Sequence, residues 1–155
     1  MNSETLSERD QLFLRFAVEA AKGSLHRGYI PIAAIVADDT SLISLGVNER
    51  VQKSSLTLHA ETAALENSGR EAVPRLRSST MYCTMSPCEM CSGAILIYQI
   101  PRIIVADRTN FEGPTETLRA AGTTVLFADD EDAITMFRGF AKTNPELWRE
   151  DNGGR

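Results

Sequence analysis

Apolar residues near the start of the chain recur with a helical period. Positions 12–21 carry apolar side chains at helical spacing, and the Thr5-x-x-Glu8 pair ahead of them has the spacing of a capping box. Gly23 or Gly28 is expected to end this helix, because glycine commonly follows the last helical turn. The first predicted element is therefore an amphipathic helix.

The remaining pattern predicts strands and helices in alternation. Apolar runs over 32–37 and 42–47 flank the polar residues 38–41, which predicts two antiparallel strands joined by a turn too short for a crossover. The segment around Pro74 is expected to be a loop. Further strands are expected over 80–84, 102–107 and 124–128, and helices over 59–67, 88–98, 114–121, 131–142 and 145–150.

This order of elements predicts an α/β fold. Strands that alternate with helices after an opening hairpin favour a central mixed five-stranded sheet with helices on both faces, that is, a three-layer α/β/α sandwich. No repeat, linker or low-complexity segment divides the sequence. We therefore expect a single domain over residues 1–155, which is an ordinary domain length.

Charge and composition narrow the classes of partner. The formal net charge is -5 and no tract of lysine and arginine is present, which argues against nucleic acid and anionic membrane as partners. Charged residues within the first twenty positions exclude the apolar core of a signal peptide, and no apolar run reaches the length of a membrane span. Three cysteines do not form a disulfide framework. We expect a cytoplasmic protein.

The stretch from Ser86 to Cys91 carries the strongest chemical signal. Cys88 and Cys91 lie three apart at the predicted start of a helix, so they project from one face and can grip one metal ion. Ser86 and Glu89 have the spacing of a capping box, and a helix N-terminus favours thiolates. His59 opens another helix and supplies a third ligand. His59, Cys88 and Cys91 would hold Zn²⁺ and leave one position for water, as catalytic zinc sites do.

Other interpretations of these cysteines remain open at this point. The pair would also suit an inert buried C-x-x-C or a redox dithiol, although a redox pair needs no His-x-Glu upstream. Cys83 is a possible fourth ligand of a closed structural site. However, Cys83 falls in an apolar strand with Met81 and Met85 on the same face, which is typical of core packing.

Glu61 has an ordinary and a catalytic interpretation. A glutamate on a helix is usually a solvated surface residue. Beside a zinc-bound water, whose pKa falls to about 7, Glu61 would instead take a proton, pass it to a ring nitrogen and later protonate a departing amine.

With His-x-Glu and Pro-Cys-x-x-Cys both in place, the sequence resembles the zinc-dependent cytidine/cytosine deaminase superfamily. Within that superfamily it is most similar to the fungal-type cytosine deaminases, and the similarity runs nearly from end to end. Trp148-x-x-Asp151 is the feature that points to this branch. The stretches that carry the resemblance are 57–61, 65–70, 86–102, 110–111 and 148–151.

The resemblance implies a fold, a reaction and partners. It implies a cytidine deaminase-like sandwich, a homodimer, and hydrolysis of free cytosine to uracil and ammonia in pyrimidine salvage. Alternatives are deamination of another free base or small heterocycle, such as guanine or isocytosine, and of adenosine in tRNA. The acidic charge and the tail argue against tRNA. A catalytically dead zinc-stabilised binding module is a further alternative, against which Glu61 counts.

The resemblance also implies which residues contact the substrate. Asn48, which alone would be assigned to a strand-end turn, would pair with the pyrimidine edge. Backbone groups of Ala60 and Ser86 would meet the carbonyl oxygen and the leaving amine of the base. The remaining contacts would come from two aromatic walls of the ring pocket and a substrate-binding carboxylate: Phe111, Trp148 and Asp151.

Three departures from the fungal pattern add bulk near the expected ring site. Ala60 stands where the family has glycine between the histidine and the glutamate. Met85 replaces a leucine beside the pocket, and residues 33–35 replace a glycine-rich stretch. These changes bear on which base fits, while the zinc signature bears on the reaction class.

Overall fold

A computed structural model describes residues 5–154 and shows five strands in one mixed sheet of order β2-β1-β3-β4-β5. β1 is antiparallel to both β2 and β3, whereas β3, β4 and β5 are parallel to one another. This confirms the mixed five-stranded sheet expected from the sequence. The strands are β1 (Ala33–Ala37), β2 (Leu42–Val47), β3 (Thr80–Met85), β4 (Arg102–Asp107) and β5 (Thr124–Phe127).

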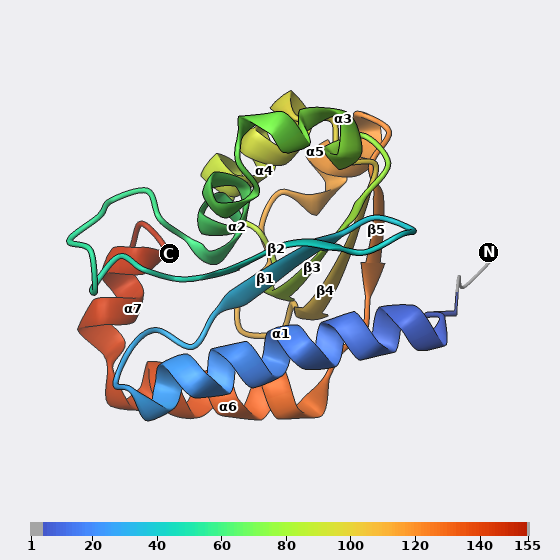
Figure 1. The fold of residues 1–155 in the computed structure, drawn as a ribbon. Helices are drawn as coiled ribbons and strands as arrows, with labels where there is room; N and C mark the ends of the chain where they lie inside the picture. The colour runs from blue at the N-terminus through green and yellow to red at the C-terminus, as the bar shows by residue number, and fades with distance from the viewer. Residues whose placement is uncertain (1–4, 155) are drawn as a thin grey trace.

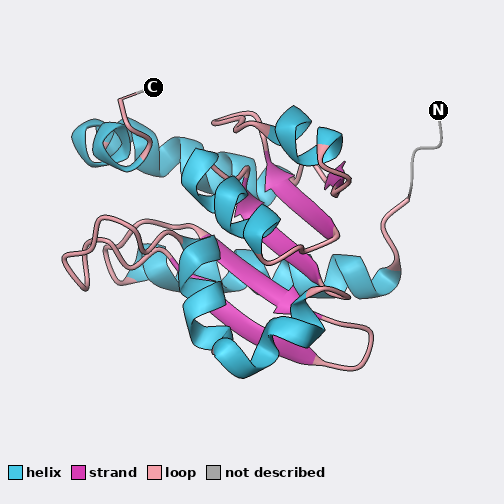
Figure 2. Cartoon of the chain, turned by 90° about the horizontal axis from the view of Figure 1, so that it is seen from above, coloured by secondary structure: helices cyan, strands magenta, loops and turns pink. Residues whose placement is uncertain are grey.

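Helices cover both faces of the sheet, so the three-layer prediction is also confirmed. Figure 1 shows α1 and α6 beneath the sheet and α2 to α5 above it, and Figure 2 shows the upper helices lying across the strands. The helices are α1 (Glu8–His26), α2 (Ala60–Ser68), the 3-10 turn η1 (Arg70–Ala72), α3 (Val73–Leu76), α4 (Glu89–Ile97), α5 (Thr115–Ala120), α6 (Glu131–Thr143) and α7 (Pro145–Asp151).

The side chains of β1 contribute to two hydrophobic clusters, one on each face of the sheet. Ala34 and Val36 pack into the cluster that includes residues of α2, α4 and α5, while Ile35 and Ala37 pack into the cluster with α1. Every residue of β1 is buried, because adjacent side chains point to opposite faces that are both covered. This explains why the sequence over 32–37 is a continuous apolar run without polar alternation.

The N-terminus of α1 is capped at a different pair of residues from the one predicted. Ser7, not Thr5, is the N-cap: its hydroxyl accepts from the Asp10 N–H, and the Asp10 carboxylate accepts from the Ser7 N–H. The same carboxylate accepts hydrogen bonds from Arg102 on β4 and from Tyr82 on β3. These long-range partners select Asp10 and lower its pKa against the effect of burial, so the prediction of Thr5-x-x-Glu8 was wrong.

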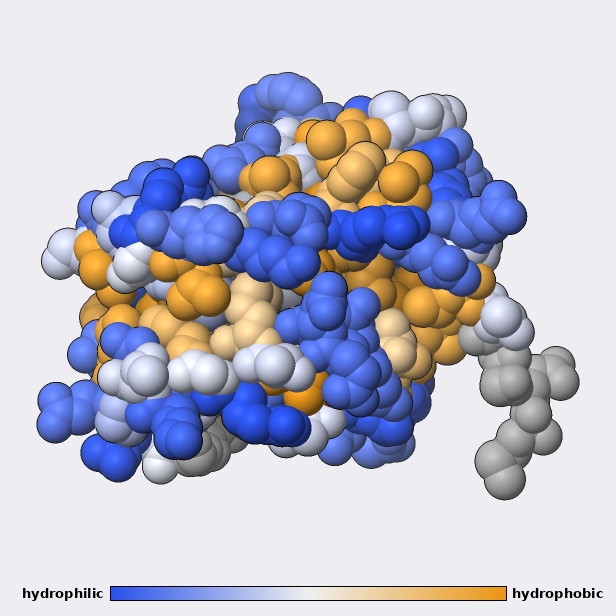
Figure 3. Space-filling view, turned by 90° about the horizontal axis from the view of Figure 1, so that it is seen from below, coloured by the Kyte–Doolittle hydropathy of each residue, from blue (hydrophilic) through white to orange (hydrophobic). Residues whose placement is uncertain are grey.

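α1 also turns a slightly different face inward than the apolar spacing indicated. Its buried apolar residues include Phe13, Leu14 and Ala17, whereas Leu12 is 43% exposed and Phe16 is 52% exposed. Seen from below, the face of the molecule over α1 and α6 mixes hydrophobic and polar side chains (Figure 3). Within the described residues, none of the helices is long and apolar enough to cross a membrane.

Two further local predictions were wrong. The segment around Pro74 is not a loop, since η1 and α3 occupy it, with proline in the first turn of α3 where its missing N–H costs nothing. The helix after Ser86 has Cys88 as its N-cap and no capping hydrogen bond from a side chain, so the Ser86-x-x-Glu89 capping box does not form. Other predicted helix and strand ends differ by one or two residues, as is usual for element boundaries.

Gly46 allows α2 to lie directly against β2. A Cβ atom at Gly46 would come within 3.0 Å of the Ala64 nitrogen and the Ala60 oxygen, closer than real Cβ atoms approach their neighbours. Both are backbone atoms of α2, so neither can rotate away. This close approach places the first turn of α2 beside the sheet, and that turn carries the residues of the site described below.

We expect Gly46→Ala to destabilise the fold strongly. Overpacking typically costs about 1–3 kcal/mol, and backbone neighbours that cannot relax put this change at about 3 kcal/mol. Gly23→Ala is the matched control: Gly23 lies inside α1, and a Cβ added there would meet nothing within 4 Å, so alanine should stabilise by up to about 1 kcal/mol. Urea unfolding of both variants tests this. Equal stability of Gly46→Ala and the wild type would contradict the packing constraint.

Candidate metal centre and pocket

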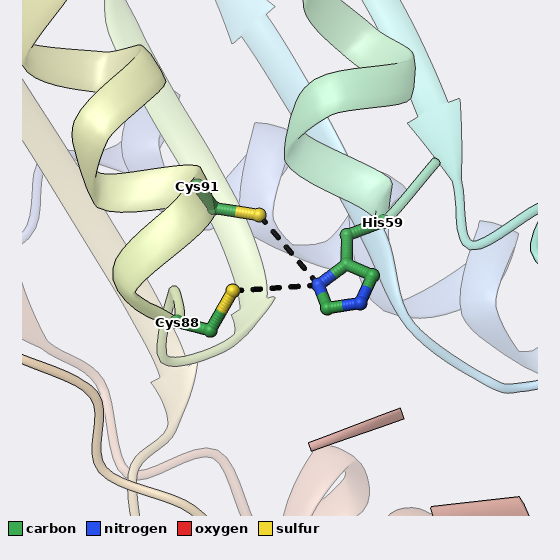
Figure 4. Close-up of side chains that lie close together, drawn as sticks. All are labelled: His59, Cys88 and Cys91. Carbon is green, nitrogen blue, oxygen red and sulfur yellow. Dashed lines mark hydrogen bonds between the residues drawn. The ribbon is translucent and has the colours of Figure 1, made fainter. Parts of the chain in front are cut away.

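The starts of two helices meet at one point above the sheet. His59 is the N-cap of α2, Cys88 is the N-cap of α4, and Cys91 lies in the first turn of α4. The His59 Nδ1 atom lies 3.5 Å from the Cys88 sulfur and 3.7 Å from the Cys91 sulfur, and both thiols point toward the imidazole in Figure 4. One nitrogen and two sulfurs therefore converge from two elements.

The spacing of these three donors fits zinc. Zn–S bonds of about 2.3 Å and Zn–N bonds of about 2.0–2.1 Å at tetrahedral angles put nitrogen and sulfur about 3.5 Å apart. The two observed separations, 3.5 and 3.7 Å, match this value, and all three donor atoms lie within 4.8 Å of one another. Three protein donors leave one tetrahedral position for another ligand, as in catalytic zinc sites.

The surroundings of Cys88 lower its pKa and favour the thiolate form that binds a metal cation. Hydrogen bonding from Cys91, and then from His59, lowers the pKa of Cys88 to about 4 even though burial opposes this shift. The same contact with Cys88, together with burial, raises the pKa of Cys91 well above its usual value. Burial opposes the charged form of His59, but the Cys88 thiolate and the nearby Asp151 and Glu61 carboxylates raise its pKa overall. A cluster that concentrates negative charge in this way suits a divalent cation.

Glu61 sits beside these donors and away from solvent. Its exposed fraction is 3%, and burial is the main reason that its pKa is raised to about 7. Glu61 lines the same pocket as His59 and Cys88. A buried carboxyl group with a pKa near neutrality can both accept and return a proton, which an ordinary surface glutamate does poorly.

A narrow pocket with a cavity volume of about 20 Å³, partly open to solvent, lies next to the three donors. Apolar and aromatic side chains with a few polar groups line it, which is typical of sites that bind small molecules. Trp148 packs edge-to-face on Phe111 at 6.0 Å and on Phe137 at 4.7 Å between ring centroids, which ties the wall of the pocket to the core. The pocket is lined by Ile32, Asn48, His59, Glu61, Met85, Ser86, Cys88, Phe111, Trp148, Asp151 and Asn152.

The polar end of the pocket combines residues that are far apart in the sequence. The Asn48 amide nitrogen donates to Asp151 Oδ1 at 2.8 Å, and the same oxygen lies 3.6 Å from His59 Nε2. The His59 ring therefore faces the sulfurs with Nδ1 and a carboxylate with Nε2. Carboxylates in this position commonly fix the orientation of a metal-ligating histidine.

Ser86 shapes the opposite wall through its side chain and backbone. Its hydroxyl accepts from the Gly113 N–H at 3.0 Å, and its own N–H donates to the Asp107 carbonyl. A Cβ at Gly113 would clash with the Pro87 carbonyl oxygen, so only glycine permits this approach. The hydroxyl that was expected to cap α4 instead holds the loop that carries Phe111.

The structure brings together nearly all of the predicted site side chains. Met85 lines the pocket as expected from the departures in sequence, whereas residues 33–35 do not. Ala60 is fully buried as the first residue of α2, and its side chain is not among those that line the pocket. Its N–H is one of the amides that lack a partner within the helix. The roles assigned to these residues stay predictions.

Sequence reasoning missed Ile32, Arg50 and Asn152. Ile32 was assigned to the first strand but not to the pocket, which it lines together with Asn152. Arg50 is buried and binds the carboxylates of Glu150 and Asp151 at 2.9 and 3.3 Å. Its position two residues after Asn48 was the only available signal, because no motif surrounds it.

Comparisons with known proteins agree with this geometry. The family model described as "Cytidine and deoxycytidylate deaminase zinc-binding region" matches residues 7–107, which include His59, Glu61, Cys88 and Cys91. A cytosine deaminase from Candida albicans is 39% identical over 145 residues, covering 93% of this chain and 97% of that protein. A tRNA-specific adenosine deaminase from Haemophilus influenzae is 40% identical over 100 residues, covering 63% of this chain and 58% of that protein.

A solved structure confirms the fold class. The guanine deaminase from Nitrosomonas europaea superposes with a TM-score of 0.74 at 22% identity, covering 91% of this chain and 88% of that one. At this identity the likeness concerns the fold alone. Asp151 and the aromatic wall formed by Phe111 and Trp148 lie outside the residues that the family model matches.

We expect about one zinc per chain, and loss of most of it in Cys88→Ala and Cys91→Ala. Each change leaves two protein donors, too few for a firm tetrahedral site. Cys83→Ala is the control, because Cys83 is fully buried in β3 and is not part of the His59–Cys88–Cys91 cluster. Atomic absorption on the purified variants measures this. Zinc loss in Cys83→Ala equal to that in Cys88→Ala would instead indicate a closed site with four protein ligands.

Proposed function

The chain belongs to the cytidine and deoxycytidylate deaminase zinc-binding family, and we propose that it hydrolyses free cytosine to uracil and ammonia. It is a zinc-dependent hydrolase of the cytosine deaminase type. The observation that carries the choice of substrate is the pocket itself. An amide, a carboxylate and an aromatic wall converge there on the metal donors, under a C-terminal helix that closes one side.

His59, Cys88 and Cys91 are the residues that would hold the zinc. When bound, zinc polarises a water molecule and lowers its pKa to about 7. We assign to Glu61 the transfer of a proton from the attacking water to the ring nitrogen beside the amino-bearing carbon, because it is buried and lines the same pocket as His59 and Cys88. Glu61 would then take the second proton from the oxygen newly bonded to that carbon and pass it to the amino group, so that the C–N bond breaks and ammonia leaves. A pKa near 7 suits both directions of transfer.

Asn48 and Asp151 would orient the base in the pocket. The side-chain oxygen of Asn48 accepts a hydrogen bond from the backbone N–H of Arg50 at 3.1 Å. This bond fixes the side-chain amide so that its NH₂ group faces Asp151. The contacts of Asp151 with Asn48, Arg50 and His59 all meet Oδ1, so Oδ2 is the oxygen that we assign to an N–H group of the substrate. The Ser86 carbonyl is assigned to the leaving amine. This set discriminates by hydrogen-bond pattern as well as by shape.

The C-terminal helix supports a free base over a nucleoside. Trp148 and Asp151 both come from α7 and line the pocket, so a ribose attached to the ring would have to displace this helix. Packing of Trp148 on Phe137 and Phe111 keeps the helix in place beside the pocket. This argument also applies to a nucleotide in tRNA, which is bulkier still.

Two further predictions concern the protein's surroundings. The family resemblance implies a homodimer, and the exposed apolar side chains of Leu56 (82% exposed) and Ile97 (74%) provide surface that a second copy would cover. Sedimentation velocity measures this directly. The cytoplasmic location stays a prediction from the sequence.

We expect Glu61→Gln to retain zinc and fold while losing nearly all activity. The amide has the same shape and cannot carry protons, and loss of general acid–base catalysis costs about 100- to 10,000-fold in kcat. Glu66→Gln is the control, because Glu66 lies on the same helix and is exposed. Ammonia release and zinc content are measured together. Turnover by Glu61→Gln within tenfold of the wild type would remove this residue from the mechanism.

An ammonia-release screen tests the proposed substrate. Free cytosine should be deaminated at least about 100-fold more efficiently than cytidine, guanine or an adenosine-containing tRNA anticodon stem-loop, because we assign the amide, the carboxylate and the aromatic wall of the pocket to one pyrimidine ring beside α7. Isocytosine and 5-substituted cytosines have a similar ring, so they test which hydrogen bonds and substituents the pocket accepts. Preference for guanine would move the assignment to the other free-base deaminases, and efficient cytidine turnover would show that α7 does not close the pocket as proposed.

A further inference from the structure

We propose that Arg50 is a positioning residue that locks the C-terminal helix α7 over the pocket and holds Asp151 in place. The role of Asp151 toward a base rests on the proposed function, whereas the locking of α7 does not. Arg50 lies in the loop after β2, and Figure 1 shows this loop beside α7 at one end of the sheet. The side chains that join the two segments are 100 and 101 residues apart in sequence.

The guanidinium of Arg50 bridges two consecutive carboxylates of α7. One nitrogen lies 2.9 Å from Glu150 Oε1, and another lies 3.3 Å from Asp151 Oδ1. The Arg50 side chain is only 6% exposed, and that of Asp151 only 3%. Hydrogen bonds between buried charged groups are stronger than those at the surface, and the planar guanidinium can serve both carboxylates at once.

The backbone of Arg50 reaches the other polar residue of the pocket. Its N–H donates to Asn48 Oδ1, and Asn48 Nδ2 in turn donates to the Asp151 oxygen that Arg50 also binds. Arg50 therefore contacts both side chains that we assign to base recognition, from behind and without lining the pocket. This placement is that of a support for the site.

The burial of Arg50 is costly and thus calls for a reason. Its Nε is buried without a hydrogen-bond partner in the part of the chain that the structure describes, and an unpaired buried donor opposes folding. α7 has seven residues, too few for a helix that is stable by itself, so its position depends on tertiary contacts. Without the guanidinium, Asp151 and Glu150 lose their shared cation, and the hydrogen bond from Asn48 and the packing of Trp148 have to hold the helix.

A single tryptophan allows the position of α7 to be measured without any substrate. Trp148 is the only tryptophan in the chain and lies on α7, so its emission and its quenching by acrylamide report on this helix. Arg50→Met removes the charge and keeps an unbranched apolar stem. We expect a red-shifted emission maximum and stronger quenching in this variant, with zinc content unchanged.

Arg102→Met is the matched control. Arg102 also gives two hydrogen bonds to a buried carboxylate, that of Asp10, but it lies on β4 and does not line the pocket. Its loss should lower the melting temperature without changing Trp148 emission below the transition. Arg50→Lys is the second variant in case Arg50→Met folds poorly. An ammonium keeps the charge and cannot match the fork geometry, so we expect an intermediate effect.

Kinetics separate positioning from general stability. Arg50→Met should lower kcat/KM about 10- to 100-fold, the effect of one hydrogen bond to a charged group, mainly through a higher KM. In an Asp151→Asn background the same change should alter kcat/KM less than about twofold, because its target is already impaired. Arg102→Met should leave kcat/KM within about twofold of the wild type.

Each part of the proposal has a result that would overturn it. Unchanged Trp148 emission and quenching in Arg50→Met, or equal changes in Arg50→Met and Arg102→Met, would overturn the proposal. Full additivity of Arg50→Met and Asp151→Asn would overturn the action through Asp151. If cytosine is not the substrate, the fluorescence result still decides whether Arg50 locks α7, so failure of the two proposals can be told apart.

Discussion

The site depends on the meeting of two helix N-termini in one layer above the sheet. His59 at the start of α2 and Cys88 at the start of α4 bring nitrogen and sulfur to 3.5 Å, the separation that a shared zinc ion requires. Gly46 permits the contact of α2 with β2, and Gly113 permits the loop after β4 to touch Pro87. Two positions that accept no side chain therefore set the geometry of the donors before any metal binds.

The pocket has a second half that the metal donors do not provide. Asn48 follows β2 and Asp151 ends the chain's last helix, and their hydrogen bond joins segments 103 residues apart. Asp151 also faces the outer nitrogen of His59, so the two halves share one imidazole. The family model ends before Phe111, Trp148 and Asp151, so its match covers the half of the pocket that contains the metal donors.

Sequence reasoning predicted the features that depend on local pattern. The sheet, most helices and the convergence of His59, Cys88 and Cys91 follow from periodicity and from a motif whose members start helices. The predictions were wrong where a residue distant in the sequence determines which hydrogen bond a side chain makes. Asp10 caps α1 because Arg102 and Tyr82 also bind it, and Ser86 turns to Gly113 rather than to its own helix. Arg50 could not be found, because its partners Glu150 and Asp151 come close only in the folded chain.

His59, Cys88 and Cys91 would together hold one zinc ion and leave one coordination position open beside Glu61. X-ray absorption at the zinc edge of the purified protein measures this coordination. We expect two sulfur neighbours at about 2.3 Å and two lighter neighbours at about 2.0–2.1 Å, one of them an imidazole nitrogen. Three sulfur neighbours would bring Cys83 into the coordination sphere and contradict the open site, and four light neighbours would contradict the assignment of both cysteines.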